Sequence, residues 1–119
     1  MFAVIYRNYV KEGHDELFQQ AWNEVANYFV QHRGAIGSCL HRSSDGLWVA
    51  YSRWPDKKTR DASWPSDEDP SAELPVEIRK AVLTLKSCLD QERAFPEIHM
   101  DVIEDLLVNL SAQGNKTCE

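Results

Sequence analysis

The chain has few cysteines, and their arrangement excludes two common roles. Three are present, at positions 39, 88 and 118, with no Cys-x-x-Cys spacing among them. An odd number without that spacing indicates neither a disulfide framework nor a zinc site. His14, His32 and His99 are also too scattered to follow a metal-ligand pattern. We therefore expect no bound metal, and we expect Cys39 to be a small buried hydrophobic residue.

Positive charge and a signal-like N-terminus are also missing. The formal net charge is −6 and no basic patch is visible, which argues against a nucleic-acid partner or an anionic membrane surface. No basic segment followed by an apolar run and a cleavage site opens the chain, so we expect a cytoplasmic protein. At 119 residues, 43% of them hydrophobic, the chain can build one domain with its own core. We place that domain at residues 1–110 and expect a flexible tail over 111–119, which lacks apolar content.

The stretch over residues 35–54 predicts a β-hairpin. Two runs of β-branched, aromatic and small residues flank the segment Ser43-Ser44-Asp45-Gly46, where Asp begins a turn and Gly accepts a positive φ. Strand alternation then gives both faces of the second run large apolar groups. One face carries Leu47, Val49, Tyr51 and Arg53, and the other carries Trp48, Ala50, Ser52 and Trp54. Such a sheet needs two covering layers: its own helices, and something else such as a second subunit.

The rest of the chain predicts two further strands and two main helices. Alternating apolar residues predict strands over 2–10 and 97–108, the second interrupted by Glu104. Apolar residues three and four apart predict helices over 14–33 and 76–93. Between the hairpin and the second helix we expect a capped helical turn over 55–61 and a mobile loop over 65–75. The order β-α-β-β-α-β matches the α+β, ferredoxin-like pattern, in which two helices cover one face of a four-stranded antiparallel sheet. The other face would be exposed in a monomer, and an exposed apolar face usually means oligomerisation.

Four segments carry a family resemblance through their order and spacing: FAVIYR, KEGHDELFQQAW, GAIGSCLHRSSDGLWVAYSRWPD and VIEDLLV. With them, the chain from residue 2 to about residue 108 resembles the antibiotic biosynthesis monooxygenase (ABM) type of the dimeric α+β barrel superfamily. The resemblance implies a homodimer whose two sheets pack face to face into a barrel. It also implies a pocket in each subunit between the helices and the sheet.

Enzymes of this type mostly oxidise aromatic phenols or quinols with O2 and use no metal or flavin. A phenol that loses its proton is electron-rich enough to reduce O2 directly, so the protein needs only to bind, desolvate and orient it. The resemblance therefore implies a monooxygenase without a cofactor. The alternative is a non-catalytic homodimeric module that binds a small hydrophobic ligand or fills its own pocket. An open cavity with converging polar groups favours the enzyme, and filling by Trp22, Trp54 and Trp64 favours the module.

A related branch of the superfamily degrades haem, and this sequence departs from its pattern. Tyr6 occupies the first-strand place of that branch's pocket Asn, and Trp64 lies close to its pocket Trp. The haem-ligating His expected after that Trp is missing, since residues 65–75 contain no histidine. The Asn that is present, Asn8, shares the strand face of Tyr6 and is a candidate for the same pocket.

Seven residues are candidates for the site. The catalytic candidates are Asn8, His41 and Trp64, with His41 as general base because the unperturbed pKa of histidine lies near neutrality. The substrate-binding candidates are Tyr6, Trp22, Tyr51 and Trp54, which offer aromatic surface or a hydroxyl. Each has a structural alternative: a solvent-facing strand position for His41, core packing for the tryptophans, and satisfied core hydroxyls for the tyrosines.

Overall fold

The computed structural model describes residues 1–64 and 74–107, and its elements follow the predicted order. They are β1 (Phe2–Asn8), α1 (Asp15–His32), β2 (Gly37–Arg42), β3 (Trp48–Trp54), α2 (Lys57–Ser63), α3 (Val76–Ser87), the 3-10 turn η1 (Gln91–Arg93) and β4 (Ile98–Asp101). Most of the loop expected over 65–75 and the whole tail expected over 111–119 lie outside the described residues.

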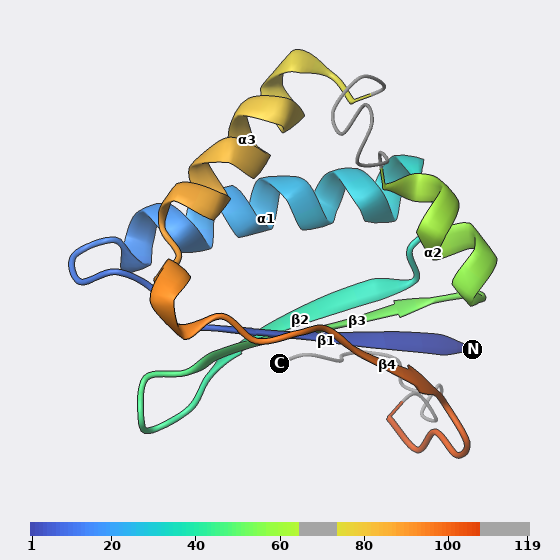
Figure 1. Ribbon diagram of the computed structural model, residues 1–119. Helices are drawn as coiled ribbons and strands as arrows, with labels where there is room; N and C mark the ends of the chain where they lie inside the picture. The colour runs from blue at the N-terminus through green and yellow to red at the C-terminus, as the bar shows by residue number, and fades with distance from the viewer. Residues whose placement is uncertain (65–73, 108–119) are drawn as a thin grey trace.

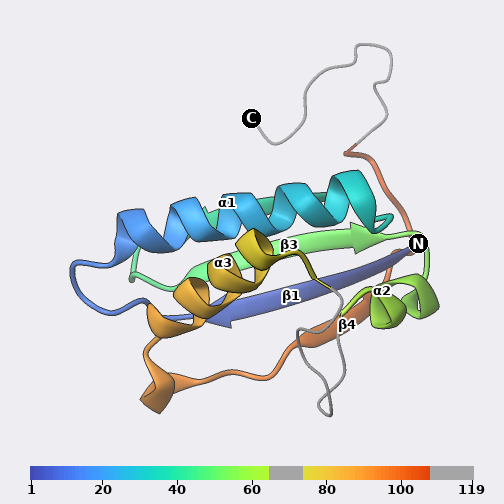
Figure 2. The same ribbon diagram turned by 90° about the horizontal axis from the view of Figure 1, so that it is seen from above.

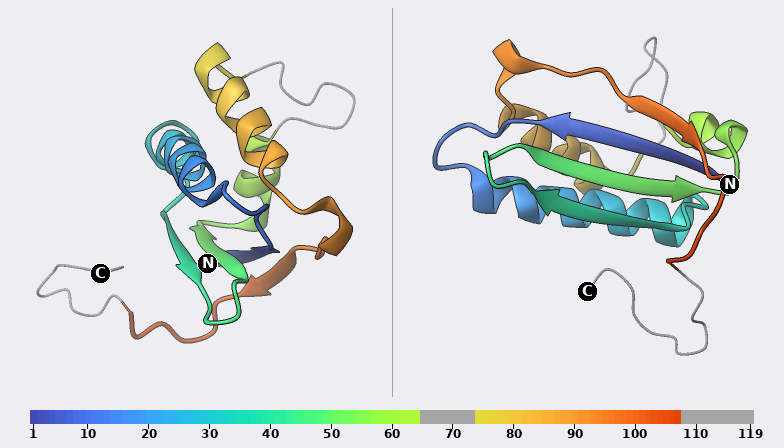
Figure 3. Two further views of the ribbon diagram at one scale, coloured as in Figure 1. Left: turned by 90° about the vertical axis from the view of Figure 1, so that its left-hand side faces the viewer. Right: turned by 90° about the horizontal axis from the view of Figure 1, so that it is seen from below.

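The four strands form one antiparallel sheet in the order β2-β3-β1-β4. The central strand β1 pairs with β3 on one side, where Tyr6 lies opposite Ala50, and with β4 on the other, where Ile5 lies opposite Ile98. Helices α1 and α3 lie side by side over one face of this sheet (Figures 1 and 2). Seen from below, the other face carries no described helix (Figure 3). The α+β, ferredoxin-like prediction is therefore confirmed.

The hairpin forms as the sequence predicts, and it shows which face is the inner one. Gly46 has a φ of +93°, and the Ser43 amide donates to the Leu47 carbonyl at 2.8 Å to close the turn. On β3 the residues that face the helices are 3–8% exposed, whereas the alternate residues are only half-buried. The buried set is Trp48, Ala50, Ser52 and Trp54.

The core lies between the inner sheet face and the apolar stripe of α1. That stripe consists of Phe18, Ala21, Val25 and Phe29. The Phe29 ring lies 6.2 Å from the Trp54 ring and 4.4 Å from the Trp64 ring, measured between centroids. Aromatic contacts therefore join α1 to the end of β3 and to the residue that follows α2.

The prediction of one helix over residues 76–93 was wrong at its C-terminal end. Helix α3 stops at Ser87, because the backbone beyond it bonds to the segment that follows β1. The Cys88 carbonyl accepts from the Lys11 amide at 2.8 Å, and the Asp90 amide donates to the Tyr9 carbonyl at 2.9 Å. These long-range bonds replace the last predicted helical turns, and helical spacing alone gives no sign of them.

The last strand is also shorter than the predicted span of 97–108. Strand β4 ends at Asp101 because it pairs only with β1, which begins at Phe2; one further bond joins the Val102 amide to the Met1 carbonyl. The chain then runs along the face opposite the helices (Figure 3), where the Arg53 guanidinium forms a two-pronged ion pair with Asp105. Residue 108 lies outside the described residues.

Replacing Trp54 by Ala is expected to lower the free energy of unfolding by about 3–5 kcal/mol, because it removes a buried ring from the core. Trp22→Ala is the matched control, since Trp22 is only half-buried and its loss should cost clearly less. Urea denaturation of the two variants and the parent measures the difference. Equal losses would contradict this assignment of the core.

Candidate active site

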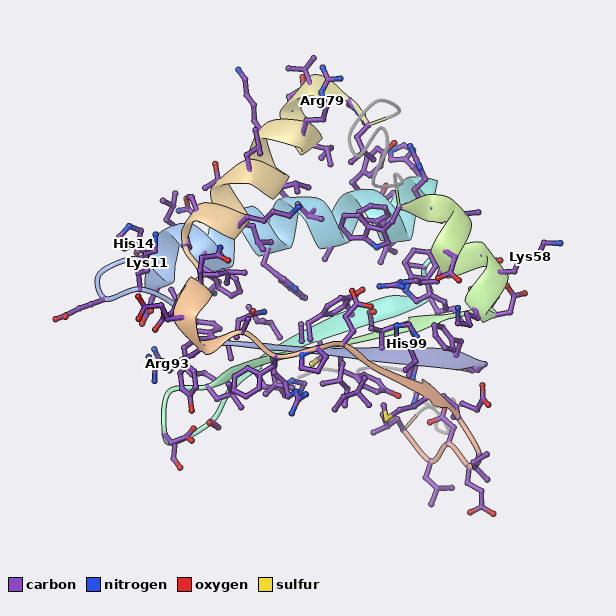
Figure 4. All side chains as sticks on the ribbon, viewed as in Figure 1. Lys11, His14, Lys58, Arg79, Arg93 and His99 are labelled. Atoms are coloured by element: carbon purple, nitrogen blue, oxygen red, sulfur yellow. The ribbon has the colours of Figure 1, made fainter. Side chains whose placement is uncertain are left out.

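Four polar side chains meet on the inner sheet face, beneath α2 and beside the edge strand β4. The Arg60 guanidinium donates through Nη2 to Tyr6 Oη at 3.0 Å and to Glu97 Oε1 at 2.7 Å. His99 Nε2 lies 2.9 Å from the same carboxylate oxygen. Figure 4 shows His99 below α2 at the level of the sheet. We refer to Tyr6, Arg60, Glu97 and His99 as the polar cluster.

Strand register and a helix cap bring the polar cluster together. His99 pairs with Val4, so His99, and Glu97 two residues before it, share the inner face with Tyr6. Helix α2 begins after Asp56, whose side chain accepts from the Thr59 amide at 2.7 Å. This cap fixes the start of the short helix that places the Arg60 side chain, which is only 11% exposed, against the sheet.

The charges of the polar cluster are balanced. Burial raises the pKa of Tyr6, although the Arg60 hydrogen bond and charge act in the opposite direction. Tyr6 is therefore a neutral phenol near pH 7. Burial also opposes ionisation of Glu97, but His99 and Arg60 outweigh it and lower the pKa of that carboxyl. The cluster thus holds a carboxylate against a guanidinium.

Aromatic side chains border the polar cluster. Tyr6 and Trp64 both pack against the core cluster that contains Phe29 and Trp54. Trp54 is only 3% exposed, whereas Trp64 is half-buried. Three of the seven candidates from the sequence, Tyr6, Trp54 and Trp64, are thus brought into one region.

The other four candidates lie elsewhere. Trp22 and His41 line a groove of about 720 Å³ between α1 and β2, at the opposite edge of the sheet from β4. His41 is exposed, with Nδ1 3.1 Å from the Val49 carbonyl oxygen. Asn8 lies opposite Trp48 at the far end of β1. Tyr51 is on the face away from the helices, where its hydroxyl accepts from Arg53 Nε at 3.0 Å.

Reasoning from the sequence did not select Arg60, Glu97 or His99. The alternation of Ile98 and Met100 implies that Glu97 and His99 share the opposite face, but only the pairing with β1 shows that this face meets Tyr6. Arg60 lies in a polar helical turn that offers no apolar pattern to orient it. A search for charged residues on the face that opposes the apolar alternation would have found the first two.

Within residues 1–64 and 74–107, no three His, Cys, Asp or Glu side chains are grouped closely enough to hold a metal ion. Over the same ranges, every helix is too short or too polar to cross a membrane.

The fold is that of a ferredoxin-like α+β domain, and the family model of the antibiotic biosynthesis monooxygenases matches residues 1–64. That match spans more than half of the 119 residues. The chain belongs to the antibiotic biosynthesis monooxygenase family. None of the curated proteins compared with it is a significant match.

Solved structures share the fold at low sequence identity. A crystal structure of an antibiotic biosynthesis monooxygenase is 15% identical, with a TM-score of 0.64 over 87% of this chain and 100% of its own. SnoaB, a cofactor-independent oxygenase from Streptomyces nogalater, is 15% identical, with a TM-score of 0.64 over 88% of this chain and 95% of its own. A conserved protein from Methanosarcina mazei is 16% identical, with a TM-score of 0.63 over 83% of this chain and 89% of its own.

The electrostatics of the polar cluster predict an unusual tyrosine titration. One phenol should ionise at a higher pH than an ordinary tyrosine, because burial disfavours its phenolate, and this step should vanish in Tyr6→Phe. Arg60→Met should raise the pKa of Tyr6 further, since the guanidinium favours the phenolate. Ultraviolet absorbance against pH measures these steps, with Tyr9→Phe as the control. A high-pH step that persists in Tyr6→Phe would contradict the assignment.

Proposed function

We propose that the protein is a cofactor-independent monooxygenase that oxidises an aromatic phenol or quinol with O2. The observation that carries the proposal is the polar cluster beside an aromatic wall in a chain of this family. That one of the structurally similar proteins is a cofactor-independent oxygenase lends support. Without a cofactor, the substrate itself supplies the electrons that reduce O2.

In this proposal the substrate oxygen binds beside Tyr6 and Arg60, and its ring packs against Trp64. Loss of the phenolic proton creates a negative charge that fixed donors stabilise best in a site from which water is excluded. Arg60 supplies positive charge and Tyr6 supplies a neutral O–H group. The roles suggested for Asn8, Trp22, His41 and Tyr51 stay predictions, since these residues lie apart from the polar cluster.

A second candidate function is a binding module without catalysis. It is favoured by the packing of the tryptophans, because Trp54 is almost fully buried and Trp64 stacks on Phe29 at 4.4 Å. Side chains then take up part of the space that a substrate needs. The ligand of such a module would be small and hydrophobic.

Oxygen uptake separates the two functions. With an oxygen electrode, we expect the metal-free protein to consume O2 above the spontaneous rate with at least one anthrone-like or hydroquinone substrate. Arg60→Met should lower the rate about 100- to 1000-fold, as does the loss of one donor to developing charge. Tyr6→Phe and Trp64→Ala should also lower it.

Two controls accompany this assay. Tyr9→Phe and Arg79→Met should keep the parent rate, because Tyr9 is outside the polar cluster and Arg79 lies on α3 away from the sheet (Figure 4). No uptake above the spontaneous rate with any substrate would contradict the enzyme and favour the binding module. Equal losses in the controls and the site variants would contradict the location of the site.

We also propose that two copies pair through the outer sheet face, the face away from the helices. Its apolar side chains are only half-buried in one chain: Ile5, Val49, Tyr51, Ile98 and Met100. Beyond β4, the side chains of Ile103, Leu106 and Leu107 are 86%, 83% and 71% exposed. Such a surface is stabilised when a second apolar surface covers it.

Light scattering tests this pairing. The parent protein should be a dimer at micromolar concentration, and Val49→Asp should yield monomers, because it would bury a charge in the paired face. Glu77→Gln on α3, the helix on the opposite side of the sheet, serves as the control and should leave the dimer intact. A monomeric parent protein would contradict the proposal that two copies pair through the outer sheet face.

A further inference from the structure

Two reciprocal contacts join the C-terminal ends of α1 and α2. Arg33 is the C-cap of α1, and its Nη1 donates to the carbonyl oxygen of Ser63, the last residue of α2, at 2.9 Å. In return, the Ser63 hydroxyl lies 3.0 Å from the Arg33 carbonyl oxygen. The last carbonyls of a helix have no partner within that helix. Each helix therefore supplies a donor to the open end of the other.

Further contacts fix the Arg33–Ser63 pair in place. Arg33 Nε donates to Tyr28 Oη at 3.3 Å, and the guanidinium carbon lies 5.4 Å from the centre of the Tyr28 ring. Ser63 is 6% exposed, and its hydroxyl also lies 2.7 Å from the Thr59 carbonyl oxygen. The chain leaves α1 so close to α2 that a Cβ added at Gly34 would lie 3.3 Å from Thr59 Cγ2. Figure 1 shows α2 beside the C-terminal end of α1.

Helix α2 is too short to hold its own position. It has seven residues, and helices shorter than about 12–15 residues are marginal by themselves, so contacts with the rest of the fold decide where it lies. The Asp56 cap fixes its first turn, and the Arg33–Ser63 pair fixes its last. Arg60 lies one helical turn before Ser63, and both side chains are on the buried side of α2. A shift of the last turn therefore moves Arg60 as well.

We propose that Arg33 is a positioning residue, which holds α2 through Ser63 so that Arg60 reaches the polar cluster. The two bonds that Arg60 makes there, 3.0 Å to Tyr6 and 2.7 Å to Glu97, are close to ideal length. Hydrogen bonds weaken steeply as they lengthen, so a displaced α2 would weaken both. The inference rests on the proposed function only where it predicts a reaction rate, because the position of Arg60 can be measured without a substrate.

The pKa of Tyr6 reports that position. Burial raises this pKa, while the hydrogen bond and the charge of Arg60 lower it, with further contributions from Glu97 and Ser52. In Arg33→Met, Arg60 should withdraw, and the pKa of Tyr6 should rise in the same direction as in Arg60→Met. Carbon-13 NMR of ring-labelled protein follows each of the four tyrosines separately, and Tyr6→Phe assigns the signal.

A double variant separates an effect through Arg60 from a direct effect of the lost charge. If Arg33 acts through Arg60, Arg33→Met should leave the pKa of Tyr6 unchanged once Arg60 is already replaced by Met. Arg33→Lys keeps a donor for the Ser63 carbonyl and should reverse part of the rise. Ser63→Ala removes only the returning contact, so its smaller rise tests the same link should Arg33→Met not fold. Arg79→Met, the control on α3, should keep the parent pKa.

The rate of oxygen uptake is scored separately. We expect Arg33→Met to lower it about 10- to 100-fold, since misplacing a group by about 1 Å can cost that much, and Arg33→Lys to recover part of the loss. An unchanged pKa of Tyr6 in Arg33→Met and Ser63→Ala, or an equal rise in the double variant, would overturn the inference. A raised pKa in a protein that consumes no O2 would support the positioning role and refute the oxygenase alone.

Discussion

The pairing of β1 with both β3 and β4 is the constraint on which the rest of the structure depends. It sets which side chains face the helices, because a shift of one residue in either register would move every residue of a strand to the opposite face. With the observed register, Tyr6, Ser52 and His99 share the inner face, and Ile5 and Ile98 share the outer one. The core, the polar cluster and the uncovered apolar face all follow from this one arrangement.

The inner face of the sheet combines an apolar aromatic core with a partly buried ion pair. Toward α1, the rings of Phe29, Trp54 and Trp64 form an apolar core. Beneath α2, an arginine with an 11% exposed side chain is held between a phenol and a carboxylate. Burying a charge is costly unless it is paired, and here the pairing leaves one buried guanidinium N–H without an acceptor.

Much of the fold could be predicted from local patterns, because those patterns decide local structure. The 35–54 hairpin has a strong turn and clear alternation, and the first helix has a regular apolar stripe. The ends of α3 and β4 could not be predicted, since the first depends on bonds to Tyr9 and Lys11 and the second on where β1 begins. In both cases a distant part of the backbone determines the boundary.

The candidate site shows the same division. Tyr6 and Trp64 were selected from a family resemblance, and both lie in the region where the polar cluster meets the core. The sequence did not indicate the other three members of the polar cluster, Arg60, Glu97 and His99. Their proximity comes from pairing across the sheet and from the position of a short polar helix. When the pairing of distant strands brings the side chains of a site together, their spacing in the sequence does not reveal it.

A double-mutant cycle between Tyr6→Phe and Arg60→Met tests the central claim that the polar cluster is a coupled unit within the fold. Free energies of unfolding for the parent, the two single variants and the double variant would be measured by urea denaturation. Side chains in direct contact should show a coupling energy of about 0.5–3 kcal/mol. Losses that simply add, within about 0.3–0.5 kcal/mol, would mean that the two groups do not interact as the structure describes.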